Sequence, residues 1–157
     1  MWVAKFKLKD NEDIYSHLNK KHKLEFYASP YTHYEKNQLI HLFVGGILVG
    51  TDKNKQNYIQ DLKKDSRVES VDVSKDFLFV HATHKISREL RAEIKIFYNP
   101  QYIRIRPVHV SSDGWEYWEV ACQDRDELNK LMQSAKKYYS GKLIYLKRQK
   151  ITNISTM

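Results

Sequence analysis

The sequence predicts an α+β fold in which small antiparallel sheets are each covered by a helix on one face. Short segments alternate between apolar and polar residues, as half-buried strands do. Other segments begin with a capping residue and place apolar residues three or four positions apart, as helices do. The order hairpin, helix, strand occurs twice along the chain, which indicates two similar halves.

The N-terminal region is expected to form a strand followed by a short helix. Apolar residues and lysines alternate from Trp2 to Lys9, which favours a half-buried strand. Asp13 is a suitable N-cap for a short helix with Ile14 and Leu18 on one face.

A hairpin and a longer helix follow. The apolar segments 24–34 and 39–49 flank the turn signal of residues 35–38, so they are expected to pair. Thr51 offers an N-cap oxygen, and the helix after it is expected to end near Asp65.

Two more strands, Val68–Val73 and Phe77–Ala82, are predicted around the turn Lys75-Asp76. The segment Lys85–Phe97 places apolar residues four apart, which favours a short helix. A connecting arm is the alternative for this segment.

The second hairpin is predicted from Ile103–Val110 and Trp115–Cys122, closed by the turn Asp113-Gly114. Asp124 is expected to cap the next helix, with Glu127 completing a capping box. A final strand is expected over residues 143–151.

These elements predict two ferredoxin-like halves, each a small antiparallel sheet with helices on one face. Residues 1–97 form the first half with a connecting segment, and residues 98–157 form the second half of hairpin, helix and strand. No linker rich in Pro, Gly or Ser divides them, so the halves are expected to pack as one body.

The composition narrows the class of protein. The chain has 157 residues, of which 41% are hydrophobic, and no stretch approaches the ~18 apolar residues of a membrane span. Cys122 is the only cysteine, which excludes an internal disulfide and leaves a cytoplasmic location as the simplest expectation. The net charge of +8 favours nucleic acid, anionic ligands or acidic partners, with a solvated Lys-rich surface as the alternative.

Several short motifs occur together in one known family. They are Tyr98-Asn99-Pro100, Pro107-Val108, Asp113-Gly114, Trp118-Glu119-Val120-Ala121, Asp124-Arg125 and, more loosely, the Asp-x-Arg-Val of Asp65 to Val68. Through these motifs the chain resembles the N-terminal region of archaeal helix-turn-helix transcription regulators of the bacterio-opsin-activator type. The match is strongest between residues 98 and 125.

The resemblance implies a regulatory role. In that family a helix-turn-helix near the C-terminus binds DNA, and the N-terminal region is assigned to sensing, dimerisation or regulation. Six residues follow Ile151, too few for a recognition helix, so the DNA-reading activity is not carried over. We therefore expect a stand-alone relative or a fragment of a longer regulator, which acts as a homo-oligomer or with a separate regulator.

The second hairpin supplies the candidate ligand site. With Asp113-Gly114 at its tip, Ser112 is expected to lie opposite Trp115, and side chains alternate between faces. One face then holds Ile103, Ile105, Trp118, Val120 and Cys122 as core. The other holds Arg104, Arg106, Trp115, Tyr117 and Glu119. These groups suit a small anionic or planar ligand, while packing against the first half and plain exposed surface remain as alternatives.

An alternative function is nucleic-acid binding by the densest basic region, which consists of Lys136, Lys137, Lys142, Lys147, Arg148 and Lys150. The same residues also suit a solvated helix face and an edge strand protected by charge.

No motif predicts an enzyme, a cofactor or a metal site. Glu116 and Glu119 are three apart on one strand, so they are expected on opposite faces and cannot act together as acid and base. The glycine-rich segment 45–51 lacks the lysine of a phosphate loop. None of the seven histidines has a recognised metal-ligand spacing.

Overall fold

The structure, a computed structural model, describes residues 1–150 and 152 and shows an α+β protein. Its elements are β1 (Trp2–Leu8), α1 (Ile14–His22), β2 (Glu25–Lys36), β3 (Leu39–Val49), α2 (Asp52–Lys64), β4 (Val68–Ser74), β5 (Phe77–Lys85), α3 (Arg88–Phe97), β6 (Ile103–Arg104), β7 (Val108–Val110), β8 (Glu116–Cys122), α4 (Arg125–Tyr139) and β9 (Lys142–Arg148). The predicted α+β class is therefore confirmed.

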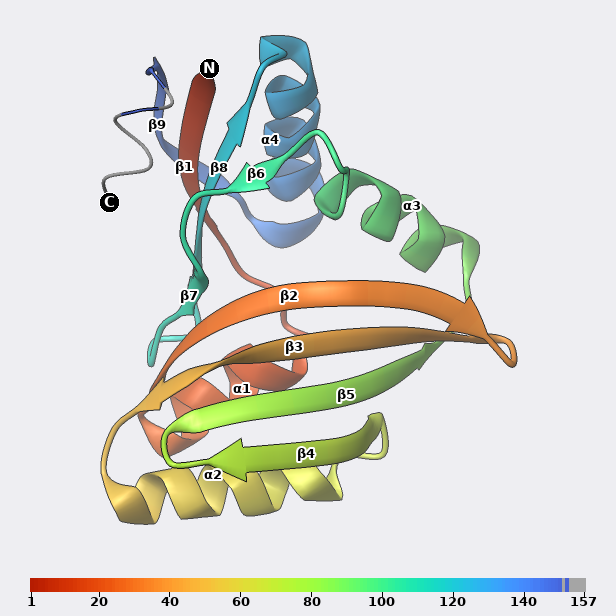
Figure 1. Ribbon diagram of the computed structural model, residues 1–157, viewed down its shortest axis with the longest axis vertical. Helices are drawn as coiled ribbons and strands as arrows, with labels where there is room; N and C mark the ends of the chain where they lie inside the picture. Colours follow the sequence, from red (N-terminus) through yellow and green to blue (C-terminus); the bar gives the residue numbers. More distant parts are fainter. Residues whose placement is uncertain (151, 153–157) are drawn as a thin grey trace.

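All nine strands of the described residues belong to one antiparallel sheet, ordered β4-β5-β3-β2-β7-β8-β1-β9, with β6 paired to β8. Two groups of strands meet at a narrow seam (Figure 1). The first half contains β4, β5, β3 and β2, and the second half contains β7, β6, β8, β1 and β9. The seam is the pairing of β2 with β7 over three residue pairs, Phe26 with Val110, Tyr27 with His109 and Ala28 with Val108.

The second half includes a strand from the start of the chain. β1 lies between β8 and β9, while β5 lies between β3 and β4. The strands of the first half all lie within residues 25–85, but β1, at the start of the predicted segment 1–97, belongs to the second half. Adjacent residues of β1, Val3 and Ala4, are both buried. Ala4 belongs to the core under the helices, and Val3 packs with Ala121 beneath Met1, Ile105 and Tyr145 on the other face.

Both halves repeat one connection. α2 joins β3 to β4 around the antiparallel β5, and α4 joins β8 to β9 around the antiparallel β1. A helix that links two parallel strands across an intervening strand is a split β-α-β unit. The order of hairpin, helix and strand that repeats in the sequence therefore corresponds to two split β-α-β units in the structure.

The capping residues predicted from the sequence begin the helices. Asp13 Oδ2 accepts hydrogen bonds from the backbone N–H groups of Tyr15 and Ser16 at 3.0 and 2.8 Å. Thr51 Oγ1 accepts from the N–H of Asn54 at 3.2 Å. These side chains satisfy donors that have no partner within the helix.

Three local predictions have defined outcomes. Residues 88–97 form the helix α3, so the alternative of a connecting arm is wrong. The carboxylate of Glu127 accepts hydrogen bonds from Asn99 and Lys130, so no capping box with Asp124 forms. The last strand ends at Arg148, and Ile151 lies outside the described residues.

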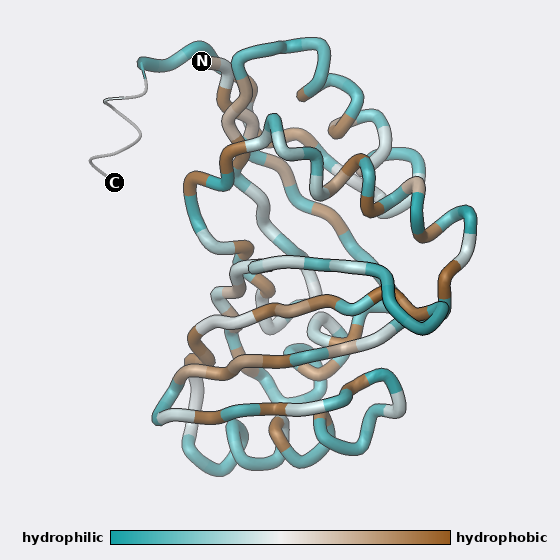
Figure 2. The backbone as a smooth tube through the Cα atoms, turned by 45° about the vertical axis from the view of Figure 1, so that its right-hand side comes forward, coloured by the Kyte–Doolittle hydropathy of each residue, from teal (hydrophilic) through white to brown (hydrophobic). Residues whose placement is uncertain are grey.

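One hydrophobic core lies between the sheet and the helices. Its members from the sheet include Phe6, Phe26 and Trp118, and residues of all four helices pack against them. All the helices therefore cover the same face of the sheet. The helices alternate between hydrophobic and hydrophilic positions in Figure 2, as amphipathic helices do. Among the described residues, no helix has the length and apolar character needed to span a membrane.

Candidate anion-binding site

The second hairpin has a different register from the predicted one. Its loop contains three residues, so the N–H of Ser111, not of Ser112, donates to the carbonyl of Trp115 at 2.8 Å. Gly114 has a φ of +87°, and its N–H donates to the carbonyl of Ser111 at 3.0 Å. This is a type I turn followed by a left-handed residue. A register change of one residue moves the side chains of β6 and β7 to the opposite face. Arg106 lies in the irregular segment between these two strands and remains beside Glu119.

Arg104 consequently leaves the predicted site. It pairs with Val120 in the sheet, and its guanidinium lies 5.3 Å from the Trp118 ring on the face covered by helices. Its Nη2 donates to the carbonyl of Phe97 at 2.8 Å. The prediction that Ile103 belongs to the core is wrong for the same reason, because this residue is exposed on the other side.

The other four predicted residues lie together on the uncovered face of the second half, hereafter the open face. Trp115 is surrounded by lysines from separate segments. The ammonium groups of Lys7, Lys9 and Lys142 lie 4.4, 4.5 and 5.5 Å from the centroid of its ring. Within the part of the chain that the structure describes, none of the three has a carboxylate within 4.0 Å. Asp113 is the acidic residue near this lysine cluster: burial is outweighed by the backbone N–H of Trp115, the Ser111 side chain and the charge of Lys9, which lower the pKa of its carboxyl. Three ammonium groups near one carboxylate leave the lysine cluster with net positive charge.

Glu119 is the acidic residue of the open face, and other groups already occupy its oxygens. Tyr145 donates its hydroxyl to Oε1 at 2.6 Å, and Arg106 Nε lies 3.4 Å from Oε2. Burial, together with the bond to Glu119, raises the pKa of Tyr145 to about 12. Lys147 lies 4.4 Å above the Tyr145 ring. Glu119 thus pairs with Arg106 and Tyr145 and not with the lysine cluster.

Tyr117 belongs to a stack of rings that crosses the seam. Its ring centroid lies 5.5 Å from that of His109, which in turn lies 4.6 Å from that of Tyr27. His109 Nε2 also contacts Glu25 at 2.6 Å. Because the rings stack on one another across strands, they turn their edges rather than their faces outward. This arrangement stabilises the seam and does not offer a platform on which bases stack.

The predicted basic region is divided by the structure. Lys142 and Lys147 lie on the open face, whereas Lys136 and Lys137 lie in the last turn of α4, where positive charge suits the helix dipole. Arg148 pairs with Trp2, and Lys150 lies beyond β9. Sequence reasoning missed Lys7 and Lys9. Their period-two alternation was visible, but nothing local indicates that β1 lies next to β8.

A buried acidic pair on the helix-covered face was also missed. The hydroxyl of Ser16 lies 2.9 Å from Asp13 Oδ2 and 3.1 Å from Glu116 Oε1, and Trp118 Nε1 donates to Glu116 Oε2 at 3.0 Å. Burial, reinforced by the nearby Asp13 carboxylate, raises the pKa of Glu116 to about 8. Glu116, in an otherwise apolar alternation with Trp118 and Val120, was the one signal available.

The two carboxylates Glu116 and Glu119 lie on opposite faces, as the alternation predicts. They therefore cannot act on one substrate. Among the described residues, no three His, Cys, Asp or Glu side chains come together to hold a metal ion.

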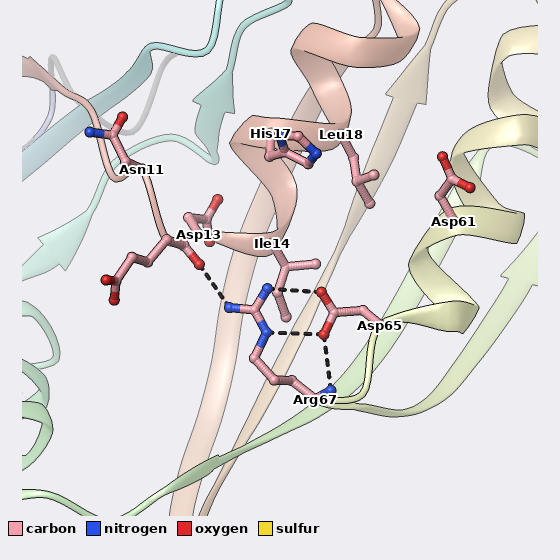
Figure 3. Close-up of a pocket in the computed structure, with 9 residues that line it drawn as sticks. Asn11, Asp13, Ile14, His17, Leu18, Asp61, Asp65 and Arg67 are labelled. Carbon is pink, nitrogen blue, oxygen red and sulfur yellow. Dashed lines mark hydrogen bonds and ion pairs between the residues drawn. The ribbon is translucent and has the colours of Figure 1, made fainter.

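A hollow of about 420 Å³ lies between α1 and α2, and its charged groups are largely paired with one another (Figure 3). Arg67 makes two bonds to the Asp65 carboxylate, at 3.0 and 2.8 Å, and donates to the carbonyl of Glu12 at 2.7 Å. Asp61 contacts Lys21 and His22, each at 2.7 Å. These pairs tie α2 to α1, so we assign this hollow a structural role.

The lysine cluster at Trp115 is thus the site that the geometry favours. No model of a known protein family matches the chain, and no curated protein matches it either.

Proposed function

We propose that the chain is a regulatory, ligand-sensing domain that binds a small anionic ligand on the open face at Trp115. The observation that carries this proposal is the convergence of the Lys7, Lys9 and Lys142 ammonium groups, whose charge Asp113 near Lys9 offsets only in part. A phosphate-bearing ligand would neutralise all three charges and accept their hydrogen bonds. The domain would act in the cytoplasm without catalysing a reaction, as a homo-oligomer or with a separate regulator.

The mechanism we propose is a population shift between two packings of the halves. Lys7 and Lys9 lie on and just after β1, and the chain continues from Lys9 directly to α1 beside the first half. A ligand that prefers one position of Lys9 relative to Lys142 therefore favours one packing of the halves.

For the fold, we infer that the chain consists of two ferredoxin-like units that have exchanged their first strands. The element order β1-α1-β2-β3-α2-β4 is followed by the same order in β5-α3-β6/β7-β8-α4-β9. Each unit lacks its own first strand in its sheet and contains that of the other. This exchange supports the proposed mechanism, because a movement of one unit also moves the strand that it contributes to the sheet of the other unit.

The anion proposal is tested by calorimetric titration with tripolyphosphate at low salt. We expect Lys7→Gln and Lys142→Gln each to weaken binding by about tenfold, since each removes one charge-assisted contact worth roughly 1.5–3 kcal/mol. Lys64→Gln, an exposed lysine at the end of α2, is the matched control and should bind like the wild type. Equal affinity in all four proteins would remove the lysine cluster from the proposal.

Nucleic-acid binding is the second candidate, and one observation favours it. Lys5 and Lys147 extend the positive charge of the open face beyond the lysine cluster. In the pairing of β1 with β9, Lys5 lies opposite Tyr145, and Lys147 lies opposite Val3. Single-stranded oligonucleotides of increasing length distinguish the candidates. Affinity that rises with length and falls steeply with salt would establish nucleic-acid binding, whereas equal affinity for tripolyphosphate and oligonucleotide would establish a small-anion site.

A further inference from the structure

Two histidines from distant parts of the sequence meet on the uncovered face of the first half. His41 belongs to β3 and His81 to β5, which are neighbours in the sheet (Figure 1). Val80 and Ala82, on either side of His81, belong to the core under the helices, so His81 points away from them. Nδ1 of His41 lies 2.8 Å from Nε2 of His81. The fold thus brings together two imidazole nitrogens, the commonest metal ligands in proteins.

A backbone carbonyl fixes the position of the proton on His41. Its Nε2 lies 3.3 Å from the carbonyl oxygen of Lys36, and only a protonated Nε2 can donate to that oxygen. The neutral ring therefore presents the lone pair of Nδ1 to His81. Metal-binding histidines are oriented in this way, with the second ring nitrogen donating to a carbonyl or a carboxylate.

Aromatic rings on the neighbouring strands hold both imidazoles in place. Tyr34 stacks on His41 with 4.7 Å between the ring centroids, and Phe43 stacks on His81 at 4.4 Å. Stacking covers the faces of the imidazoles and leaves the nitrogens at their edges. Both histidines are half-buried, so the pair is held in position and is still accessible to an ion from solvent.

One carboxylate lies beside the histidine pair. Thr83, which is opposite His41 in the sheet, donates its hydroxyl to Glu69 Oε1 at 3.1 Å. The exposed Lys36 and Lys85 lie two residues beyond this row, where their flexible side chains can turn toward solvent. Glu69 therefore offsets part of the charge of a cation bound between the imidazoles.

We propose that His41 and His81 chelate one divalent transition-metal ion, such as Zn²⁺ or Cu²⁺. With bonds of about 2.0–2.1 Å, two nitrogen ligands lie about 2.9 Å apart at a right angle and about 3.3 Å apart at the tetrahedral angle, close to the observed 2.8 Å. Because no third His, Cys, Asp or Glu joins them among the described residues, water completes the coordination.

The ion takes the place of the proton that lies between the two nitrogens. A neutral His81 can carry its proton on Nδ1 instead, so Nε2 becomes a ligand while the ring keeps one proton. A bound ion joins β3 to β5. The inference goes beyond the anion site and does not rest on it, because the lysine cluster lies in the other half.

The first experiment is calorimetric titration with Zn²⁺ in a buffer free of phosphate. We expect the wild type to bind one ion at the pair, and His41→Gln and His81→Gln each to weaken binding by about a hundredfold, because two linked contacts become one. His33→Gln is the matched control and should bind like the wild type. His33 is an exposed histidine of β2 whose ring packs against Tyr98, beside the core under the helices. A wild type that does not bind Zn²⁺, or an unchanged affinity in His41→Gln and His81→Gln, would overturn the proposal.

The second experiment counts the nitrogen ligands by electron paramagnetic resonance of the protein with one equivalent of Cu²⁺. The wild type and His33→Gln should show two imidazole nitrogens, and His81→Gln should show fewer. Zn²⁺ should also raise the melting temperature of the wild type and not that of His41→Gln, because the ion binds only the folded pair. A wild-type spectrum with a single imidazole nitrogen rules the chelate out, and this result holds even if a variant does not fold.

Discussion

At the scale of single residues, the open face and the helix-covered face of β8 have opposite electrostatics. On the open face, three lysine ammonium groups gather at Trp115 and outnumber the one nearby carboxylate, Asp113. On the covered face, Glu116 and Asp13 share a buried site with Ser16. Asp13 also caps α1, where its charge is favourable, so Glu116 is the carboxyl that retains a proton.

The raised pKa of Glu116 makes stability depend on pH. The folded value of about 8 lies above the ordinary value of 4.5, so the folded state holds the proton more tightly. The protonated Glu116 carboxyl contributes to the free energy of unfolding. This contribution is complete below about pH 4.5, declines as pH rises, and is lost above about pH 8. Glu116→Gln keeps the hydrogen bonds and cannot ionise. We expect it to be more stable than the wild type at pH 8.5 by on the order of 1–3 kcal/mol.

Urea unfolding from pH 5 to pH 9 measures this effect. The difference between Glu116→Gln and the wild type should grow with pH and level off. Glu89→Gln, an exposed carboxylate on α3, should show no such trend. A constant difference across the range would mean that Glu116 is ionised throughout.

At the scale of secondary-structure elements, the tip of the second hairpin decides which residues form the site. Both strands were predictable from their alternation, but the choice between a two-residue and a three-residue loop was not. The three-residue loop moves Arg104 to the core face and leaves Trp115 beside the lysines. Pro107 interrupts the first strand between β6 and β7, because it has no N–H to donate to the ladder.

The turn itself depends on Gly114, whose φ of +87° is unfavourable for any residue with a Cβ. An added Cβ would make an ordinary van der Waals contact with Lys20 Cδ at 3.8 Å, so backbone strain is the main cost of substitution. We expect Gly114→Ala to lower the free energy of unfolding by about 1–2 kcal/mol. Gly114→Asn should cost less, since Asn tolerates the left-handed region.

Thermal unfolding of the two variants measures the comparison. If Gly114→Ala and Gly114→Asn melt together with the wild type, the loop does not have the three-residue geometry. Tripolyphosphate affinity should fall with Gly114→Ala, because the turn positions Trp115.

A second prediction at this scale concerns the tie between α1 and α2. Arg67→Lys removes the two-bond geometry to Asp65 and the bond to the Glu12 carbonyl. Because the pair is partly exposed, the expected loss is about 1 kcal/mol in the free energy of unfolding. Lys53→Arg on the outer side of α2 is the control. If the two variants lose the same free energy of unfolding, Arg67 makes no structural contribution.

At the scale of the whole molecule, the position of β1 between β8 and β9 joins the N-terminal end of the chain to the second half. β1 buries Val3, Phe6 and Leu8 in the interior of the second half. At roughly 1.5–3 kcal/mol for each large side chain, its removal costs as much as the total stability of an ordinary domain. Deletion of residues 1–8 should therefore abolish folding.

The ends of the chain allow a matched control. The N-terminal amine of Met1 donates to the carbonyl of Gln149 at 3.0 Å, so the start of β1 lies beside the end of β9. A permuted chain in which residues 1–9 follow Lys150 through a short flexible linker should fold and give the circular dichroism of the wild type. A deletion variant that folds alone, or a permuted chain that does not fold, would contradict this position of β1.

The sequence by itself determined the elements, their caps and the α+β class, because alternation, helical spacing and Asp13 or Thr51 at a helix start act over a few residues. It also placed Arg106, Trp115, Tyr117 and Glu119 on one face. Tertiary structure alone decided the rest. The position of β1 between β8 and β9 arises from pairing between segments more than a hundred residues apart, and it is this pairing that brings Lys7 and Lys142 to Trp115.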